Sequence, residues 1–266
     1  MKTLVHMSDL HFGRTDARVV AALMPLVNKL LPDVVVVSGD LTQRARPSQF
    51  RQARRFLDAL PRPQVVVPGN HDVPLYNVFQ RFLQPLNKYR SFISEDLEPF
   101  YADSEIAVAG INTARSMTFK GGRINEQQMQ RLYERFAPLD RSLMKIVVTH
   151  HPFDLPDGHE SARVVGRAEA AIRMFRQCGA NIVLSGHLHA SHVGSSERRY
   201  PLDGYALKII QAGTATSTRS RGEINSFNVI RVADATVGVD RWTWQPQEGS
   251  FKISKHESFT RPNGGR

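Results

Sequence analysis

Short apolar runs alternate with amphipathic stretches along the first two thirds of the chain. Leu4–His6 and Val34–Ser38 are rich in β-branched residues and end in small or polar ones, which is typical of buried strands in a layered α/β fold. Between them, residues 17–31 carry apolar positions at helical spacing and stop at Pro32, which predicts a crossover helix. The pattern therefore predicts a strand–helix–strand unit.

The same alternation continues to about residue 190. Ser48 and Asn125 are suitable helix N-caps, Gln128 lies at the capping-box distance from Asn125, and Gly179 is a common residue just past a helix end. We expect helices over residues 48–60, 125–136 and 169–177, and strands over residues 64–67, 106–112, 143–149 and 182–185.

In the last third of the chain the helical signal fades. Strand-forming residues cluster over 205–212, 226–233 and 236–244, which predicts a second, largely antiparallel sheet packed against the first. Residues 246–266 are polar and basic, and we expect them to form a partly flexible tail after a domain spanning 1–245. The mixed segment 74–105 is a candidate cap segment, which would cover a binding site if the chain has one.

Composition favours an ordinary globular protein of the cytoplasm. Hydrophobic residues make up 41% of the chain, and the single cysteine, Cys178, can form neither an intramolecular disulfide nor a thiolate metal site alone. His6 and Asp9 interrupt the first apolar run, so it does not fit a signal-peptide core. No stretch approaches the ~20 apolar residues of a membrane span.

The chain carries 35 Lys and Arg against 25 Asp and Glu, a formal net charge of +10. Such a surface attracts nucleic acid, anionic lipid or anionic substrates, and charge runs are also common as plain solvated faces. Charge therefore leaves a peripheral membrane contact and nucleic-acid binding open, and the sequence does not decide whether the chain forms an oligomer.

Polar side chains follow the predicted strands where each one ends. Taken singly, each such motif is more often a turn or a surface hydrogen bond than a binding site. Because the loops beyond the carboxyl ends of strands converge on one crevice in α/β sheets, their joint occurrence favours one shared site. The residues are Asp9, His11, Asp40, Asn70, His71, Asp72, His150, His151, His187 and His189.

These residue types point to metal chemistry. Carboxylate, imidazole and amide oxygen without thiolate suit divalent ions such as Mn, Fe, Co or Zn. There are more candidate ligands than one ion uses, and a carboxylate such as Asp40 can bridge two ions. Paired ions about 3.5–4 Å apart clamp phosphoryl oxygens and make hydroxide available near neutral pH, which is the chemistry of phosphate-ester hydrolysis.

The order of these motifs resembles that of the calcineurin-like metallophosphoesterases. The matching stretches are Asp9-Leu10-His11, Gly39-Asp40, Gly69-Asn70-His71-Asp72, His150 and Gly186-His187-Leu188-His189, and the resemblance spans Lys2 to about Ala212. It implies an α/β fold of the family's kind, a four-layer αββα sandwich of two mixed β-sheets flanked by helices.

The resemblance also assigns roles to individual residues. One metal takes Asp9, His11, Asp40 and His189, and the other takes Asp40, Asn70, His150 and His187. His71 contacts the substrate phosphate or the leaving-group oxygen, and Asp72 orients His71 as a hydrogen-bond acceptor. The roles of His151 and Arg115 stay open, although Arg115 has the guanidinium that pairs well with phosphate.

Within this family the motifs look closest to the class III cyclic-nucleotide and glycerophosphodiester phosphodiesterases. The leading hypothesis is therefore a metal-dependent hydrolase of a small phosphodiester. Three alternatives remain: a UDP-diacylglucosamine-type pyrophosphatase at the inner membrane surface, a nuclease, and a binding module that keeps the fold without turnover.

Overall fold

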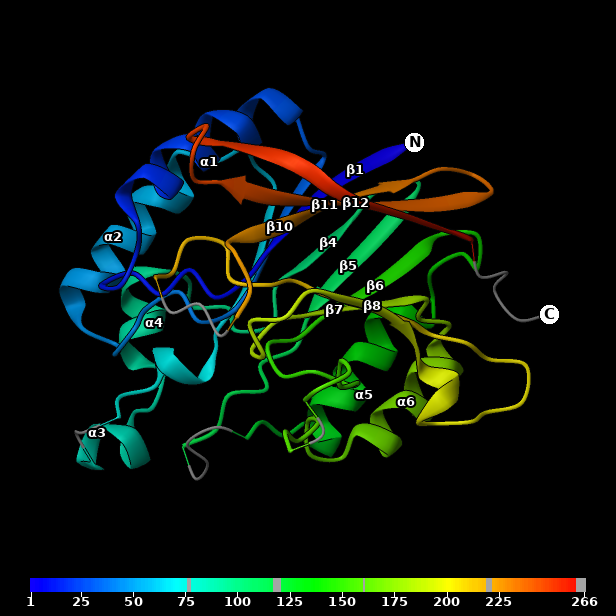
Figure 1. The fold of residues 1–266 in the computed structure, drawn as a ribbon. Helices are drawn as coiled ribbons and strands as arrows, with labels where there is room; N and C mark the ends of the chain where they lie inside the picture. The colour runs from blue at the N-terminus through cyan, green and yellow to red at the C-terminus, as the bar shows by residue number, and fades with distance from the viewer. Residues whose placement is uncertain (76–77, 117–120, 160, 219–221, 262–266) are drawn as a thin grey trace.

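Two packed β-sheets form the centre of the computed structural model, with helices on both outer faces (Figure 1). The structure describes residues 1–75, 78–116, 121–159, 161–218 and 222–261. Within these residues each sheet contains six strands. The four-layer arrangement of two mixed sheets and flanking helices is therefore confirmed.

The first sheet combines a parallel half with an antiparallel half. β1, β2 and β3 run parallel, whereas β10, β11 and β12 are added antiparallel beyond β1. The order is β12-β11-β10-β1-β2-β3. The bounds are β1 (Lys2–Met7), β2 (Val34–Ser38), β3 (Gln64–Val67), β10 (Ser226–Val232), β11 (Thr236–Gln245) and β12 (Ser250–Thr260).

The second sheet has a parallel centre and antiparallel edges. β5, β6, β7 and β9 run parallel, and β4 and β8 lie antiparallel at the two ends. The order is β4-β5-β6-β7-β9-β8. The bounds are β4 (Phe100–Ala102), β5 (Ile106–Gly110), β6 (Met144–Val148), β7 (Ile182–Ser185), β8 (His192–Ser195) and β9 (Lys208–Gln211).

Helices pack on the outer faces. α1 and α2 cover the first sheet, α5 and α6 cover the second, and α4 packs on α2, where Phe50 and Phe92 stack with ring centroids 6.0 Å apart. α3 projects from this body (Figure 1). The bounds are α1 (Ala17–Leu30), α2 (Pro47–Asp58), α3 (Val78–Leu83), α4 (Asn87–Phe92), α5 (Glu126–Phe136) and α6 (Ala168–Cys178), with short 3-10 turns at Asn70–Asp72 and Ser196–Arg198.

The valines of β2 show how the layers are held together. Val35 and Val37 face the core under α1 and α2, while Val34 and Val36 face the core between the two sheets, and all four are fully buried. A strand buried on both faces must be apolar throughout, which explains its continuous hydrophobic run. Burial of both faces holds the loop after β2 in a fixed place.

Three sequence expectations about the elements are wrong. The strands predicted over 205–212, 226–233 and 236–244 do not form one antiparallel sheet: β9 lies parallel beside β7, whereas β10 and β11 extend the first sheet. Residues 250–260 of the expected flexible tail form β12, which pairs along β11 and buries Phe251; residues 262–266 lie outside the described residues. α2 begins at Pro47 rather than after Ser48, because proline is favourable in a first helical turn.

Other expectations are confirmed. Asn125 caps α5 by accepting a hydrogen bond from the Gln128 backbone N–H (2.8 Å), and the Gln128 side chain completes the capping box. Gly179 follows α6 in the left-handed conformation. The predicted cap segment 74–105 holds α3, α4 and β4, and its role as a cap stays a prediction. Among the described residues, we find no helix with the length and apolar character needed to cross a membrane.

Candidate metal centre

The predicted site residues meet at the edge where the parallel strands of both sheets end. Asp9 and His11 follow β1, Asp40 follows β2, and Asn70 begins the turn after β3. The second sheet contributes the loops after β6 and β7. Those loops carry His150, His187 and His189, so both sheets supply side chains to one site.

Three of these side chains form one compact cluster on the first-sheet side. His11 Nε2 lies 3.1 Å from His189 Nε2, and Asp9 Oδ1 lies 3.2 Å from His189 Nε2 and 3.5 Å from His11 Nε2. All three side chains are buried. Two imidazoles and one carboxylate converging on a common point are a donor set that suits a borderline divalent ion.

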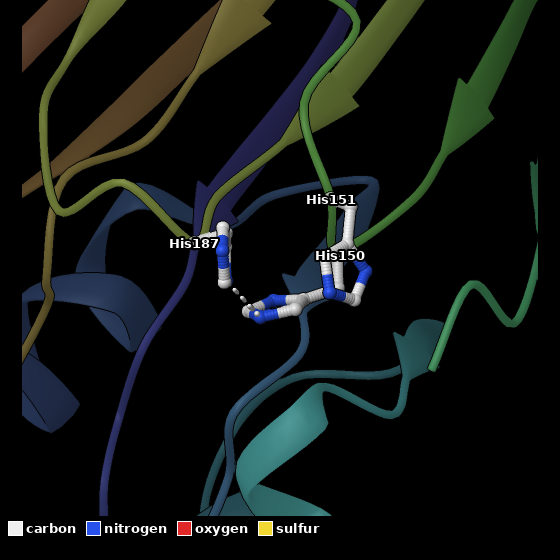
Figure 2. A group of neighbouring side chains, drawn as sticks. All are labelled: His150, His151 and His187. Carbon is white, nitrogen blue, oxygen red and sulfur yellow. Dashed lines mark hydrogen bonds between the residues drawn. The ribbon is translucent and has the colours of Figure 1, made fainter. Parts of the chain in front are cut away.

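A second cluster lies beside the first. His150 Nε2 is 3.1 Å from Asn70 Oδ1 and 3.2 Å from His187 Nδ1, the contact drawn dashed in Figure 2. The carbonyl of Ser38 accepts a hydrogen bond from His150 Nδ1 (2.8 Å). Because Nδ1 carries the proton of the neutral ring, the lone pair of Nε2 is available to a ligand.

Asp40 links the two clusters. Its Oδ2 lies 3.7 Å from His11 Nε2, and its Oδ1 lies 3.4 Å from His150 Nε2. The Asp40 side chain is almost completely buried. One carboxylate thus presents a different oxygen to each cluster, which is the arrangement of a bridging ligand.

The electrostatics of the site also fit bound cations. Burial lowers the pKa of His150, but the adjacent Asp40 carboxylate outweighs it and raises that pKa to about 9. Burial raises the pKa of Asp9, but His189 and His11 outweigh it and hold that pKa well below its ordinary value. Metal ligation requires deprotonated ligands, so a divalent ion would replace the proton of His150.

One carboxylate oxygen is left without a hydrogen bond. Asp9 Oδ1 is buried and accepts none from the described residues, although Asp9 Oδ2 accepts one from the His187 backbone N–H (2.9 Å). A buried charged oxygen without a donor is unfavourable. Its position against His11 and His189 fits a cation as the missing partner.

The backbone is strained at the residues of the site. A non-glycine residue with positive φ is uncommon, and such strain is retained where the surroundings over-determine it. Five of the seven predicted metal ligands have φ between 50° and 74°. They are Asp9, His11, Asp40, His187 and His189.

Glycines allow the close approach of these loops. A Cβ on Gly69 would lie 2.1 Å from Asp40 Oδ1, and one on Gly186 would lie 2.6 Å from Asp9 Oδ2. Gly39 has φ of +92°, and a Cβ there would lie 2.6 Å from His150 Nδ1. The glycines of the motifs therefore make room for the proposed ligands.

His71 lies beside the first cluster. Its backbone N–H donates to Asp40 Oδ1 (2.8 Å), and its ring meets the His11 ring edge-on with centroids 4.9 Å apart. His71 Nδ1 donates to the carbonyl of Gln43 (2.8 Å), a partner that the motifs did not indicate. His71 is half-buried, so it faces both the cluster and solvent.

Asp72 holds two loops of the site together, and its expected role in orienting His71 stays a prediction. Its carboxylate accepts hydrogen bonds from the backbone N–H groups of Leu41, Thr42 and Gly69 at 2.8–3.1 Å. Burial and the charge of Asp40 raise the pKa of Asp72 to about 6. Asp72 thus ties the loop after β2 to the loop after β3 and supports His71 through the backbone.

Arg115 is held by the protein around it. Its guanidinium donates to the carbonyls of Asn112 (3.2 Å) and Ala114 (3.1 Å) and to the side chain of Gln128. The structure therefore gives Arg115 a role in fixing its loop. His6 is fully buried and pairs through Nε2 with Ser38 Oγ (2.9 Å).

Comparison with known proteins places this geometry in a family. The family model described as calcineurin-like phosphoesterase matches residues 2–191. A glycerophosphodiester phosphodiesterase of Enterobacter lignolyticus is 26% identical over 201 residues, which cover 67% of this chain and 70% of that protein. A cAMP/cGMP dual specificity phosphodiesterase of Mycobacterium tuberculosis is 28% identical over 256 residues, covering 88% of this chain and 77% of that one.

The fold is also similar to that of a solved phosphatase. A purple acid phosphatase from yellow lupin (Lupinus luteus) seeds superposes with a TM-score of 0.72 at 12% identity, over 98% of this chain. This chain spans about half of that protein's length, 54%. The family match, the fold and the two clusters agree: the chain belongs to the calcineurin-like phosphoesterases and is a phosphoric ester hydrolase.

Proposed function

We propose that this hydrolase is a two-metal phosphodiesterase that acts on a small phosphodiester, such as a cyclic nucleotide or a glycerophosphodiester. The proposal rests mainly on the position of Asp40, whose two carboxylate oxygens face different ligand clusters. One ion would be held by Asp9, His11, Asp40 and His189, and the other by Asp40, Asn70, His150 and His187. The identity of the ions, among Mn, Fe, Zn and Co, is part of the proposal.

The ions, when bound, supply positive charge that stabilises the phosphoryl oxygens and lowers the pKa of water near them. The chain's own residues position the reactants. Asp40 and Asp9 hold the two clusters at fixed separation, and the rigid loops around them keep this geometry before substrate arrives. No reorganisation of the ligands is then needed during the reaction.

His71 would act on the leaving group. The Gln43 carbonyl accepts from His71 Nδ1, so the second proton of a protonated ring is carried on Nε2. We assign that proton to the oxygen of the leaving group, because an alcohol leaves more readily than an alkoxide. The hydrogen bond from the His71 backbone N–H to Asp40 Oδ1 keeps the ring next to the two clusters of proposed metal ligands.

A diester is favoured as substrate because both relatives described above carry phosphodiesterase names. The test is a turnover screen of purified protein reloaded with Mn²⁺ after chelation. Substrates are an aryl phosphodiester, cyclic nucleotides, glycerophosphodiesters, a nucleotide-sugar lipid, single-stranded DNA and the matching monoesters. We expect a small diester to be hydrolysed fastest; preference for a monoester or for DNA would contradict the proposal.

The role of His71 is tested by comparing two histidine substitutions. His71→Ala should lower kcat on a diester about 10²- to 10⁴-fold, the usual range for a lost general acid. His256→Ala is the matched control, because His256 lies exposed on β12, and it should leave kcat unchanged within twofold. Equal kcat for the two variants would remove His71 from the mechanism.

A further inference from the structure

His151 lies behind the second cluster and has no assigned role. Its ring packs against His150 (centroids 4.9 Å apart) and against His187 (4.7 Å), and Figure 2 shows the three imidazoles gathered at one point. The side chain is buried. One nitrogen of each of these three rings lies within 4.8 Å of those of the other two.

Thr113 determines where His151 carries its proton. The Thr113 hydroxyl oxygen accepts from the backbone N–H of His151 (3.3 Å) and lies 2.8 Å from His151 Nδ1. A hydroxyl has one proton, and among the described residues Nδ1 is the acceptor placed to take it. Nδ1 is then the acceptor of the neutral ring, and Nε2 carries the hydrogen.

The ring has little freedom to adopt another arrangement. A Cβ on Gly122 would lie 2.2 Å from His151 Nδ1, so the glycine backbone closes around that side of the ring. His151 Nε2, in contrast, is buried and has no hydrogen-bond partner among the described residues. A buried N–H without an acceptor is unfavourable, and such groups are rare unless a ligand or an ordered molecule pairs with them.

We propose that His151 Nε2–H donates a hydrogen bond to an oxygen of the phosphate group bound at the metal centre. His151 is then a phosphate-binding residue and not an additional metal ligand, because a protonated Nε2 has no lone pair for an ion. The inference rests on the proposed function for its ligand class, a phosphate ester. His151 Nε2 would thus donate a hydrogen, whereas His150 Nε2 would offer a lone pair to a metal ion.

The first test is the protonation of the ring itself. Nitrogen-15 NMR of the metal-free protein with labelled histidine should show His151 as a neutral ring protonated at Nε2. Thr113→Val is the matched variant, since valine keeps the shape of threonine without its hydroxyl, and it should mix the two neutral tautomers. A wild-type ring protonated at Nδ1 overturns the proposal.

The second test separates phosphate binding from metal binding. In zinc-loaded protein, His151→Leu should weaken binding of inorganic phosphate about 10- to 100-fold, the effect of losing one hydrogen bond to a charged group. Zinc content should not change, whereas the control His150→Leu should lose zinc. His151→Gln, which restores an N–H donor, should recover part of the phosphate affinity.

Three results of the second test would overturn the inference. Loss of zinc from His151→Leu makes His151 a metal ligand. Unchanged phosphate affinity in a folded His151→Leu protein makes the ring a packing residue, and equal affinities of the Leu and Gln variants contradict a donor role. Absence of phosphodiesterase turnover with normal phosphate affinity and the predicted tautomer would contradict the proposed function and leave His151 as a phosphate donor.

Discussion

Two regions of the molecule differ in backbone strain and in how their buried charges are paired. One is the edge of the sheets that carries the proposed metal ligands, and the other is the sheet wing, residues 236–260, which holds β11 and β12. At the edge, five proposed ligands have positive φ, whereas no non-glycine residue of the wing has one. At the edge, Asp9 Oδ1 is buried and accepts no hydrogen bond from the part of the chain that the structure describes. In the wing, Asp240 pairs with His256 Nδ1 (2.6 Å) and with Arg231.

This difference separates the residues that serve function from those that serve stability. In the wing the buried Asp240 carboxylate is paired with a cation, and the non-glycine residues keep ordinary backbone conformations, so these contacts stabilise the fold directly. The edge keeps strained backbone and unpaired groups in place for a ligand. Changes at the edge should therefore reduce activity with little loss of stability, and changes in the wing should do the reverse.

The largest expected effect comes from a matched pair of buried aspartates. Asp40→Ala removes the carboxylate shared by both clusters, and we expect kcat/KM on a diester to fall about 10⁴-fold, as for a central catalytic group. Asp240→Ala should lower the free energy of unfolding by about 1–3 kcal/mol, because Arg231 loses its partner, and should keep kcat/KM within twofold. The comparison fails if Asp240→Ala is the less active of the two.

The next largest effect concerns the aromatic packing of the wing. Trp244 is buried against Phe251, with ring centroids 5.4 Å apart. Trp244→Ala should lower the free energy of unfolding by about 3–4 kcal/mol, measured by urea denaturation. Ile253→Ala on β12, where the side chain is 50% exposed, should cost less than about 1 kcal/mol. Neither folded variant should lose activity, and a large loss in either would link the wing to the site.

A smaller effect is expected from a pair of glycines. In Gly186→Ala the new methyl group would lie 1.8 Å from Ser8 Oγ and 2.6 Å from Asp9 Oδ2, so Asp9 must move. A displacement of about 1 Å in an active site costs on the order of 10²-fold in rate. Gly238→Ala in β11 meets its nearest atom at 3.6 Å and should leave kcat unchanged. Normal activity of Gly186→Ala would show that the edge tolerates loose geometry.

The last effect is a pH dependence of stability, visible only below about pH 6.5, that is caused by His6 in β1. Burial lowers the pKa of His6 to about 3, against about 6.5 in an unfolded chain. The unfolded chain therefore takes up the proton first, and stability falls as pH decreases from 6.5 toward 3, by up to about 1.4 kcal/mol per pH unit. Urea denaturation of metal-free protein should show this slope, and His6→Gln should reduce it. An equal slope in both proteins would contradict a neutral, buried His6.

The two regions also differ in how far the sequence predicts them. The apolar run Val34–Ser38 predicts β2, because a strand buried on both faces is apolar throughout. Asp40 then lies in the loop that follows this strand. β12 has the opposite character: it is an edge strand whose residues from Lys252 to His256 are all exposed, so its sequence has the polar composition of a tail. The hydrophobic pattern of a sequence shows which strands are buried. An exposed edge strand buries few residues, so the pattern does not reveal it.

Long-range pairing explains the remaining errors. The apolar residues of β9 indicate a strand, but nothing local tells that it pairs with β7 rather than with β10. The hydrogen bond from the His71 ring to the Gln43 carbonyl was likewise not predicted, because a backbone atom carries no sequence signal. That these side chains meet at one candidate metal centre was predictable from residue type and position. Their supporting contacts, including Thr113 beneath His151, were not.

Anomalous X-ray scattering from crystals of the protein grown with Mn²⁺ would show directly whether the site holds two metal ions. We expect two peaks per chain, one among Asp9, His11 and His189 and the other among Asn70, His150 and His187, with Asp40 between them. A single peak, or two peaks without Asp40 in contact with both, would contradict the two-metal centre.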